Sequence, residues 1–291
     1  MSSNISLQPI SDLTAAAIFI AEYNSHTRHH VGYCGDQWKE ILYTLQNHFS
    51  DLPKRESIIG AYDNNELIGV LGLDVDKESK EAEIWGPFIK CSNWDEVAQG
   101  MWSELLRRMS IKVVRFHGFY NKNNQHAARF MKQLGFVKGG NHNILCAKPF
   151  HQNDCQNLHL QEISPDLYQS FILLHQQLFP ETYYDGSTIL NRLNDQRKVI
   201  VANNNGQLQG YVYFEANPEY KEGSIEFIGV SPDHRKKGIG RNLIKAALNQ
   251  LFYKFQINEI QLCVDADNEK ALKLYMSAGF INKHEVIYYA K

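Results

Sequence analysis

The sequence predicts a mixed α/β fold that occurs twice in one chain. The chain has 291 residues, which exceeds the usual domain size of about 100–200 residues and favours two domains. Its second half repeats patterns of its first half, and both halves alternate strand-like and helix-like segments. A hydrophobic fraction of 43% and a charged fraction of 21% are typical of a globular protein.

Three segments of the first half recur in the second half. The matching pairs are 7–11 with 160–164, 64–69 with 204–210, and 124–136 with 268–280. The last pair keeps a constant separation, which indicates a duplication. The first copy has about twelve additional residues before its hairpin, which we place in a loop. A polar stretch after Phe150 separates the copies, so we expect domains over 1–150 and 151–291.

The second copy shows its elements most clearly. Alternating or continuous apolar runs predict strands, and apolar residues three or four positions apart predict helices. Ser164-Pro165-Asp166 signals a helix start, and Pro180 separates two helices. The expected elements are, in order, a strand over 158–163, helices on both sides of Pro180, strands over 199–202, 209–214 and 224–230, a helix over 243–252, a strand over 259–264 and a helix over 270–276.

The strongest motif lies at 230–241, between a predicted strand and a predicted helix. Gly238 and Gly240 lack Cβ atoms where a backbone must approach a ligand closely. The amides that follow open a helix N-terminus, which favours phosphate. Lys236, Lys237 and Arg241 add positive charge. The motif lacks the endings of a P-loop or a dinucleotide fingerprint, and a tight turn with a solvated basic face is the alternative.

A second motif begins at Asn268 and continues into the following predicted helix. Tyr275 lies two helical turns after Asn268, so both side chains can face one cleft. Each has a simpler alternative. Asn268 can serve only as a helix N-cap, and Tyr275 can be an aromatic residue of the core.

Together the two motifs resemble the GNAT superfamily of acetyl-CoA-dependent N-acetyltransferases. The family's pyrophosphate loop, Arg/Gln-x-x-Gly-x-Gly/Ala, matches residues 235–240. Its later pattern of Asn, Ala, Tyr and Gly-Phe matches Asn268, Ala271, Tyr275 and Gly279-Phe280. The resemblance covers 158–291 well and 1–150 only in outline. It implies two tandem GNAT-like acyl-CoA N-acyltransferase domains.

The resemblance also implies acetyl-CoA as co-substrate and a role for each matching residue. The end of the strand at 228–230 would pair with the pantetheine arm like an added strand, and the loop amides would hold the pyrophosphate. An amine would attack the thioester directly in a ternary complex, with the Ile228 N–H stabilising the oxyanion and Tyr275 protonating the departing thiolate. The implied cofactor-binding residues are Ile228, Gly229, Val230, Arg235, Lys236, Lys237, Gly238, Ile239, Gly240, Arg241, Asn268 and Tyr275.

The general base departs from the family pattern. Many members have a glutamate five residues before the Asn, where this chain has Cys263. Nothing in its local sequence lowers a thiol pKa, so we expect a small buried residue. Glu226 is the best remaining base, because a regular strand would place it on the same face as Ile228. An exposed strand carboxylate is the alternative.

The first copy lacks the cofactor motif. Aligning Gly86 with Gly229 places Asp95 and Glu96 opposite Gly238 and Ile239, and these carboxylates would repel a diphosphate. Met131 occupies the position of Tyr275. We therefore expect a degenerate first domain that binds no cofactor and serves a structural or substrate-shaping role.

Other features suggest no further chemistry. His26, His29, His30 and Cys34 match no standard zinc spacing, so we expect a polar surface loop and no metal. We expect the tryptophans at 85, 94 and 102 to be packing residues. A net charge of −2 favours neither nucleic acid nor an anionic membrane.

The sequence leaves the acceptor and the compartment to general arguments. No apolar run is long enough to span a bilayer, and the N-terminus resembles no signal peptide. Five cysteines without a Cys-x-x-Cys pair suggest reduced thiols in the cytoplasm. We expect an amine acceptor, either a small molecule or a protein N-terminus, and a monomer or homodimer. Transfer of another acyl group, or coenzyme A binding without catalysis, are the alternatives.

Overall fold

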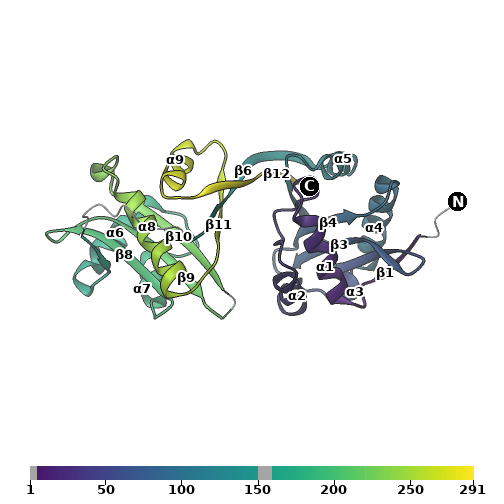
Figure 1. Cartoon of the computed structure of the whole chain (residues 1–291), viewed down its shortest axis with the longest axis horizontal. Helices are drawn as coiled ribbons and strands as arrows, with labels where there is room; N and C mark the ends of the chain where they lie inside the picture. The colour runs from purple at the N-terminus through teal and green to yellow at the C-terminus, as the bar shows by residue number, and fades with distance from the viewer. Residues whose placement is uncertain (1–4, 150–158, 220) are drawn as a thin grey trace. The chain divides into compact units, whose positions relative to one another are not determined.

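The computed structural model in Figure 1 describes residues 5–149, 159–219 and 221–291. Its contacts divide the chain into two compact units. The first unit holds Met1–His142 with His284–Lys291, and the second unit holds Asn143–Lys283. The polar stretch on which the expected boundary depended, at 151–154, lies outside the described residues.

The last strand of each copy explains why this division differs from the expected one at residue 150. Strand β6 (Val137–Ala147) begins in the first unit and ends in the second, and β12 (Ile281–Ala290) does the reverse. The end of β12 pairs antiparallel with β5 (Arg115–Asn121) of the first unit. In the second unit, β11 (Ile260–Asp265) is hydrogen-bonded to β6. The final strand of each copy therefore extends the sheet of the other copy.

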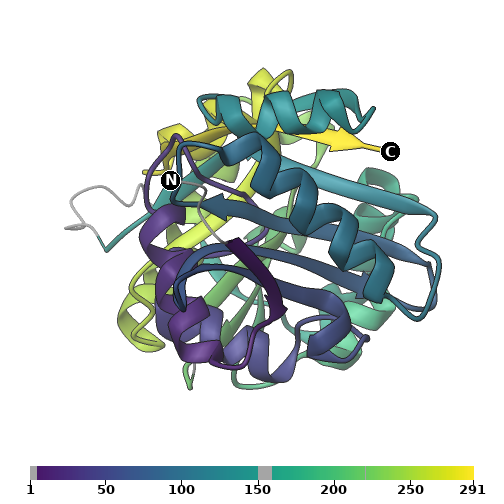
Figure 2. The same cartoon turned by 90° about the vertical axis from the view of Figure 1, so that its right-hand side faces the viewer.

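The remaining elements of the first unit follow the predicted alternation. They are β1 (Ile5–Pro9), α1 (Leu13–Asn24), α2 (Trp38–Asn47), α3 (Lys54–Ser57), β2 (Ile58–Asp63), β3 (Glu66–Asp76), β4 (Glu81–Ile89), α4 (Trp94–Arg108) and α5 (Gln125–Gln133). The strands are ordered β1-β2-β3-β4-β5-β12, and β4 and β5 run parallel. Helix α4 packs across this sheet (Figure 2). The three tryptophans are buried in the core, as predicted.

The expected surface loop at 26–34 is partly buried, so that prediction is wrong for His30 and Cys34. These residues are 6% and 5% exposed. The cause is Asn24, which is buried at the end of α1 and binds the loop backbone. Its Nδ2 donates to the carbonyl of Cys34 at 2.7 Å, and its Oδ1 accepts from the amide of Val31 at 2.6 Å. A buried side-chain amide of this kind satisfies backbone groups that the turn leaves unpaired.

The second unit contains each element that its sequence predicts, with small differences at the ends. They are β7 (Leu160–Glu162), η1 (Pro165–Leu167), α6 (Tyr168–Leu178), α7 (Gly186–Arg192), β8 (Arg197–Asn204), β9 (Gln207–Asn217), β10 (Glu222–Val230), η2 (Pro232–His234), α8 (Ile239–Asn249), the π-helical η3 (Gln250–Lys254), β11 and α9 (Glu269–Ser277). One sheet of this unit has the order β10-β9-β8-β7, which makes β10 an edge strand.

Two hydrophobic clusters cover the two faces of this sheet. Val212 and Phe214 of β9 pack with α8, whereas Tyr211 and Tyr213 pack with α6 and α7. The alternation follows from the two-residue period of a strand. None of the helices in the described ranges is both long and apolar enough to cross a membrane.

Candidate functional site

The loop before α8 leads into a helix N-terminus, as its sequence predicts. Lys236 and Gly238 adopt left-handed conformations, with φ of 61° and 78°, and α8 begins at the next residue. No side chain caps this helix. The amides of its first turn have no partner within the helix, and the helix dipole makes this end positive. An anion is the ligand that this arrangement favours.

Gly240 is needed for packing. It is buried, and a Cβ there would lie 3.2 Å from a methyl group of Leu274 and 3.5 Å from Val230. The first turn of α8 therefore packs closely against both α9 and the end of β10. This contact joins the two sequence motifs in one region of the second unit.

Side chains of the loop before α8 also form hydrogen bonds with nearby backbone carbonyls. Arg235 Nε donates to the carbonyl of Val230 at 3.2 Å, and Lys237 Nζ donates to the carbonyl of Asp233 at 3.2 Å. These bonds hold the loop across the end of β10. Among the residues expected to bind cofactor, those exposed are Arg235, Lys236, Lys237, Gly238, Arg241 and Asn268, those half-buried are Ile228, Val230 and Tyr275, and those buried are Gly229, Ile239 and Gly240.

The second motif shows both of the simpler roles that its sequence allows. Asn268 Oδ1 accepts from the amide of Ala271 at 3.1 Å, so Asn268 is the N-cap of α9. The Tyr275 ring meets Phe280 edge-on, with centroids 5.4 Å apart. Within the described residues its hydroxyl has no hydrogen-bond partner. Burial raises the pKa of Tyr275, so the hydroxyl stays protonated and can donate.

A bulge in β10 places Glu226. Ile225 lies opposite Phe214 and Phe227 lies opposite Tyr213, so Glu226 is the additional residue between them. The bulge reverses the alternation, and Phe227 joins the cluster on the α6 face while Ile228 packs on the α8 face. Such bulges commonly redirect a side chain beside an active site.

Glu226 therefore points away from the side expected for it. Tyr183 Oη donates to Glu226 Oε2 at 2.6 Å, and the Tyr183 ring packs on Phe227 with centroids 5.0 Å apart. Burial, and to a lesser extent this hydrogen bond, raises the pKa of Tyr183. The sequence prediction that Glu226 and Ile228 share a face fails because it assumed a regular strand.

Cys263 is exposed, in contrast to the expected buried position. Alternation along β11 leaves Cys263 on an open face of the strand. Desolvation, and to a lesser extent the charge of Asp265, raises the pKa of the Cys263 thiol. The thiol is therefore protonated at neutral pH and is a poor nucleophile, as the sequence predicted.

Comparison with known proteins places this site in a family. Residues 162–280 match the family model described as Acetyltransferase (GNAT) family. All of the matched residues lie in the second unit. A spermidine N(1)-acetyltransferase from Vibrio cholerae is 29% identical over 121 residues, which cover 41% of this chain and 64% of that protein. The match thus spans less than two thirds of that relative.

Solved structures extend the likeness in fold to the whole chain. A GCN5-related N-acetyltransferase from Sphaerobacter thermophilus superposes with a TM-score of 0.66 at 16% identity, and covers 99% of this chain and 95% of its own. A tandem GNAT protein from the clavulanic acid biosynthesis pathway gives a TM-score of 0.56 at 12% identity, with 99% and 98% coverage. The chain therefore has the predicted fold of two tandem GNAT-like domains.

His175, which the sequence patterns did not single out, supports the loop that carries Tyr183. The imidazole is buried, accepts at Nδ1 from Tyr211 Oη at 2.6 Å, and donates from Nε2 to the carbonyl of Tyr184 at 2.8 Å. Burial lowers the pKa of His175, which keeps the ring neutral. Its spacing in the sequence could have indicated a buried position, because His175 lies four residues after Phe171 on the apolar face of α6. In the second unit this imidazole links the Tyr183 loop to β9.

The corresponding helix of the first unit begins differently. Asp95 and Glu96 lie in the first turn of α4, and Arg129 Nε pairs with Asp95 at 3.0 Å. Met131, at the position of Tyr275, is fully buried. Tyr120 Oη donates to the carbonyl of Gly86, the residue aligned with Gly229, at 2.7 Å.

Proposed function

We propose that this protein is an acetyl-CoA-dependent N-acetyltransferase with one active site, in its second unit. The observation that carries the proposal is the uncapped N-terminus of α8, entered through left-handed Lys236 and Gly238. Free amides, a positive helix end and basic side chains at 235, 236, 237 and 241 fit a diphosphate. The carboxylates at the equivalent turn of α4 do not fit one.

The strand beside this loop fits the remainder of coenzyme A. Because β10 is an edge strand, the groups on its outer side are available to an extended ligand. Ile228, Gly229 and Val230 would hold the pantetheine arm through their backbone, and Asn268 would contact it from the start of α9. Bound acetyl-CoA would supply the activated acetyl group.

Two side chains would move protons in the transfer. Glu226, as general base, would accept a proton from the amine as its nitrogen bonds to the acetyl carbon. Tyr275 would donate its hydroxyl proton to sulfur as the carbon–sulfur bond breaks, and the Ile228 N–H would stabilise negative charge on the carbonyl oxygen. The protonated hydroxyl of Tyr275 suits this role.

The region of Glu226 suits a cationic acceptor. A carboxylate beside the rings of Tyr183 and Phe227 offers charge and aromatic surface to an ammonium group. We therefore propose a small amine as acceptor, with a protein N-terminus as the alternative. The four described cysteines are free thiols, which supports a reducing compartment such as the cytoplasm.

Mass spectrometry of reaction products tests this function. The full chain is incubated with acetyl-CoA and a panel of amines that includes spermidine and a peptide with a free N-terminus. An acetylated amine supports the proposal. Transfer only from longer acyl-CoA thioesters identifies another acyltransferase, and coenzyme A binding without product identifies a sensor.

A further inference from the structure

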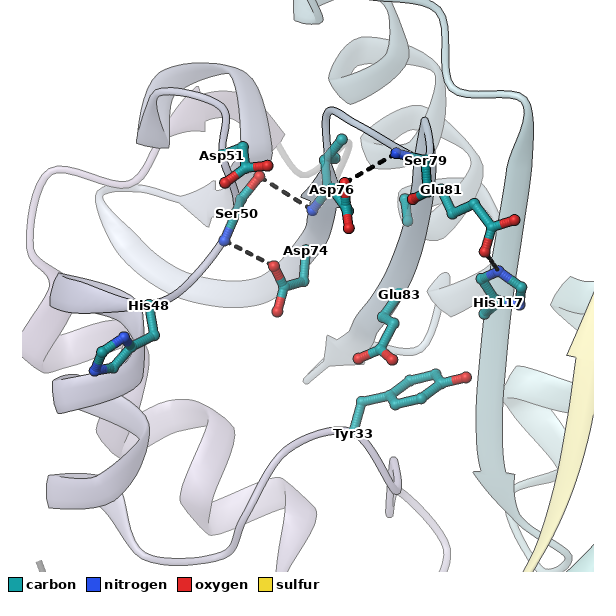
Figure 3. A pocket seen from close by; sticks show the side chains of 12 residues that line it. Tyr33, His48, Ser50, Asp51, Asp74, Asp76, Ser79, Glu81, Glu83 and His117 are labelled. Atoms are coloured by element: carbon teal, nitrogen blue, oxygen red, sulfur yellow. Dashed lines mark hydrogen bonds and ion pairs between the residues drawn. The ribbon is translucent and has the colours of Figure 1, made fainter. Parts of the chain in front are cut away.

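The first unit contains a cavity of about 580 Å³, shown in Figure 3. This volume lies within the range of about 300–1,000 Å³ for small-molecule sites. The cavity lies between the β3–β4 hairpin, the start of β5 and the segments on both sides of α2. All of its lining residues belong to the first unit. Nothing in the proposed acetyl transfer uses it.

Its walls carry a concentration of negative charge. Asp51, Asp74, Asp76, Glu81 and Glu83 line the cavity, and none of the lysines or arginines that the structure describes does. In the β3–β4 register, Asp74 lies directly opposite Glu83, and Asp76 lies directly opposite Glu81. Like charges in this position destabilise a sheet. Arg115 Nη1 pairs with Glu81 at 3.1 Å and so offsets the second pair. Asp74 and Glu83 have no ion-pair partner within the described residues, and a cation in the cavity would offset their repulsion.

Four of these carboxylates are oriented by the surrounding chain. Asp74 accepts from the amide of Ser50 at 2.7 Å, Asp51 from that of Lys77 at 2.9 Å and Asp76 from that of Ser79 at 3.0 Å. Glu81 binds His117 Nε2 at 3.0 Å and Arg115 Nη1 at 3.1 Å. Each carboxylate is held in place and keeps lone pairs for a further donor.

Glu83 differs from the other four. Within the described residues it has no hydrogen-bond partner, and Figure 3 shows its carboxyl group pointing into the cavity toward the ring of Tyr33. Desolvation, and to a lesser extent the charge of Asp74, raises the pKa of Glu83 to about 7. A cation bound beside it would favour the ionised form.

The arrangement fits an extended organic cation better than a metal ion. In the described part of the chain no three acidic, histidine or cysteine side chains gather closely enough to hold one metal. The carboxylates are spread over two strands and a loop, and the Tyr33 ring adds aromatic surface. An ammonium group at each of two positions matches this spread.

We propose that this cavity is a second ligand site, which binds a small molecule carrying two or more ammonium groups. The alignment of the two copies supports it, since Glu83 precedes Gly86 as Glu226 precedes Gly229. The first copy has thus kept a carboxylate at the acceptor position without the cofactor loop. The proposal does not depend on acetyl transfer by the second unit.

Calorimetry of the full chain without acetyl-CoA tests the site. The probes are spermidine and 1,4-diaminobutane, with 1-aminobutane, MgCl₂ and CaCl₂ as comparisons. We expect both polyamines to bind more tightly than the monoamine and the metal ions. Glu83→Gln should weaken this binding about tenfold or more, the scale of a lost charge-assisted hydrogen bond. Tight metal binding that displaces the polyamines, or no measurable binding of either polyamine, would overturn the proposal.

Matched variants locate the binding. Glu78→Gln changes an exposed carboxylate of the same hairpin that does not line the cavity. This variant should leave the polyamine isotherm unchanged, and Glu83→Asp should retain most of the affinity. Circular dichroism confirms that each variant is folded. Equal polyamine affinity of Glu83→Gln and wild type would overturn the proposal. If the wild-type protein binds polyamines but acetylates no amine, the result counts only against the proposed function.

Discussion

Helices α4 and α8 follow equivalent strands of the two copies, but their first turns carry opposite charge. The turn that opens α8 has two glycines and four basic residues and no capping side chain. The turn that opens α4 has Asp95 and Glu96, with Arg129 bound to Asp95. Each helix packs on a sheet of its own unit, α4 on β2, β3 and β4, and α8 on β8, β9 and β10. A few residues at one helix end therefore change the preferred ligand while the scaffold stays the same.

The two copies also differ around two aligned carboxylates, Glu226 in the second unit and Glu83 in the first. In the second unit Glu226 is bonded to Tyr183 beside a strand bulge. In the first unit Glu83 lies in a regular part of β4, opposite Asp74, and faces a cavity. One copy has the features that we propose for coenzyme A binding, and the other has an acidic pocket. The following predictions test this division from the largest expected effect to the smallest.

Gly238→Asp should abolish detectable binding of acetyl-CoA. The substitution gives the α8 turn the carboxylate of α4, and a side chain at φ of 78° strains the backbone. Gly206→Asp is the matched control, because Gly206 has a φ of 84° and open space around its Cβ position. Calorimetry should show one site per chain in wild type and in the control. Two equivalent sites in wild type would contradict the assignment of cofactor binding to one copy.

Tyr275→Phe should lower the single-turnover rate about 10²-fold, the usual scale for a positioned general acid. The ring and its contact with Phe280 remain, so the dissociation constant of acetyl-CoA should hardly change. Tyr168→Phe, at the half-buried first residue of α6, is the control. An unchanged rate with unchanged binding would make Tyr275 equivalent to the buried Met131 and would favour a coenzyme A sensor.

Glu226→Gln should lower turnover about tenfold or more at neutral pH, with less effect where the amine is already unprotonated. Tyr183→Phe keeps the carboxylate and removes only its hydrogen-bond donor, so its effect should be smaller. Rate–pH profiles of the two variants measure the difference. Turnover of Glu226→Gln within a fewfold of wild type at every pH would exclude Glu226 as the base.

Glu83→Gln should stabilise the ligand-free protein at neutral and higher pH. The folded protein raises the pKa of Glu83 from its ordinary value of 4.5 to about 7. Between these values the folded state holds a proton that the unfolded chain releases, so stability falls as pH rises through this window. The variant should lose this part of the pH dependence. Thermal unfolding at pH 5 and pH 8, with Glu78→Gln beside it, measures the effect, and a variant that is less stable at pH 8 would contradict it.

The sequence by itself determined the elements and the glycine-containing loop before α8. Period-two and period-three-to-four apolar patterns are local, so β8, β9, β10 and α9 lie where they were predicted. The left-handed turn at Gly238 and the N-caps at Asn124 and Asn268 likewise depend on nearby residues. The repeat and the two motifs were sufficient to predict the family and the tandem fold.

Only the tertiary structure decided which side chains meet. The exchange of β6 and β12 between the copies needs pairing between residues far apart in sequence, such as Val286 with Asn121. The bulge that turns Glu226 toward Tyr183 is set by the register of β10 on β9. The acidic cavity brings residues from 33 to 117 together. Register and strand order arise from the packing of the whole sheet, and a one-residue shift moves a side chain to the other face.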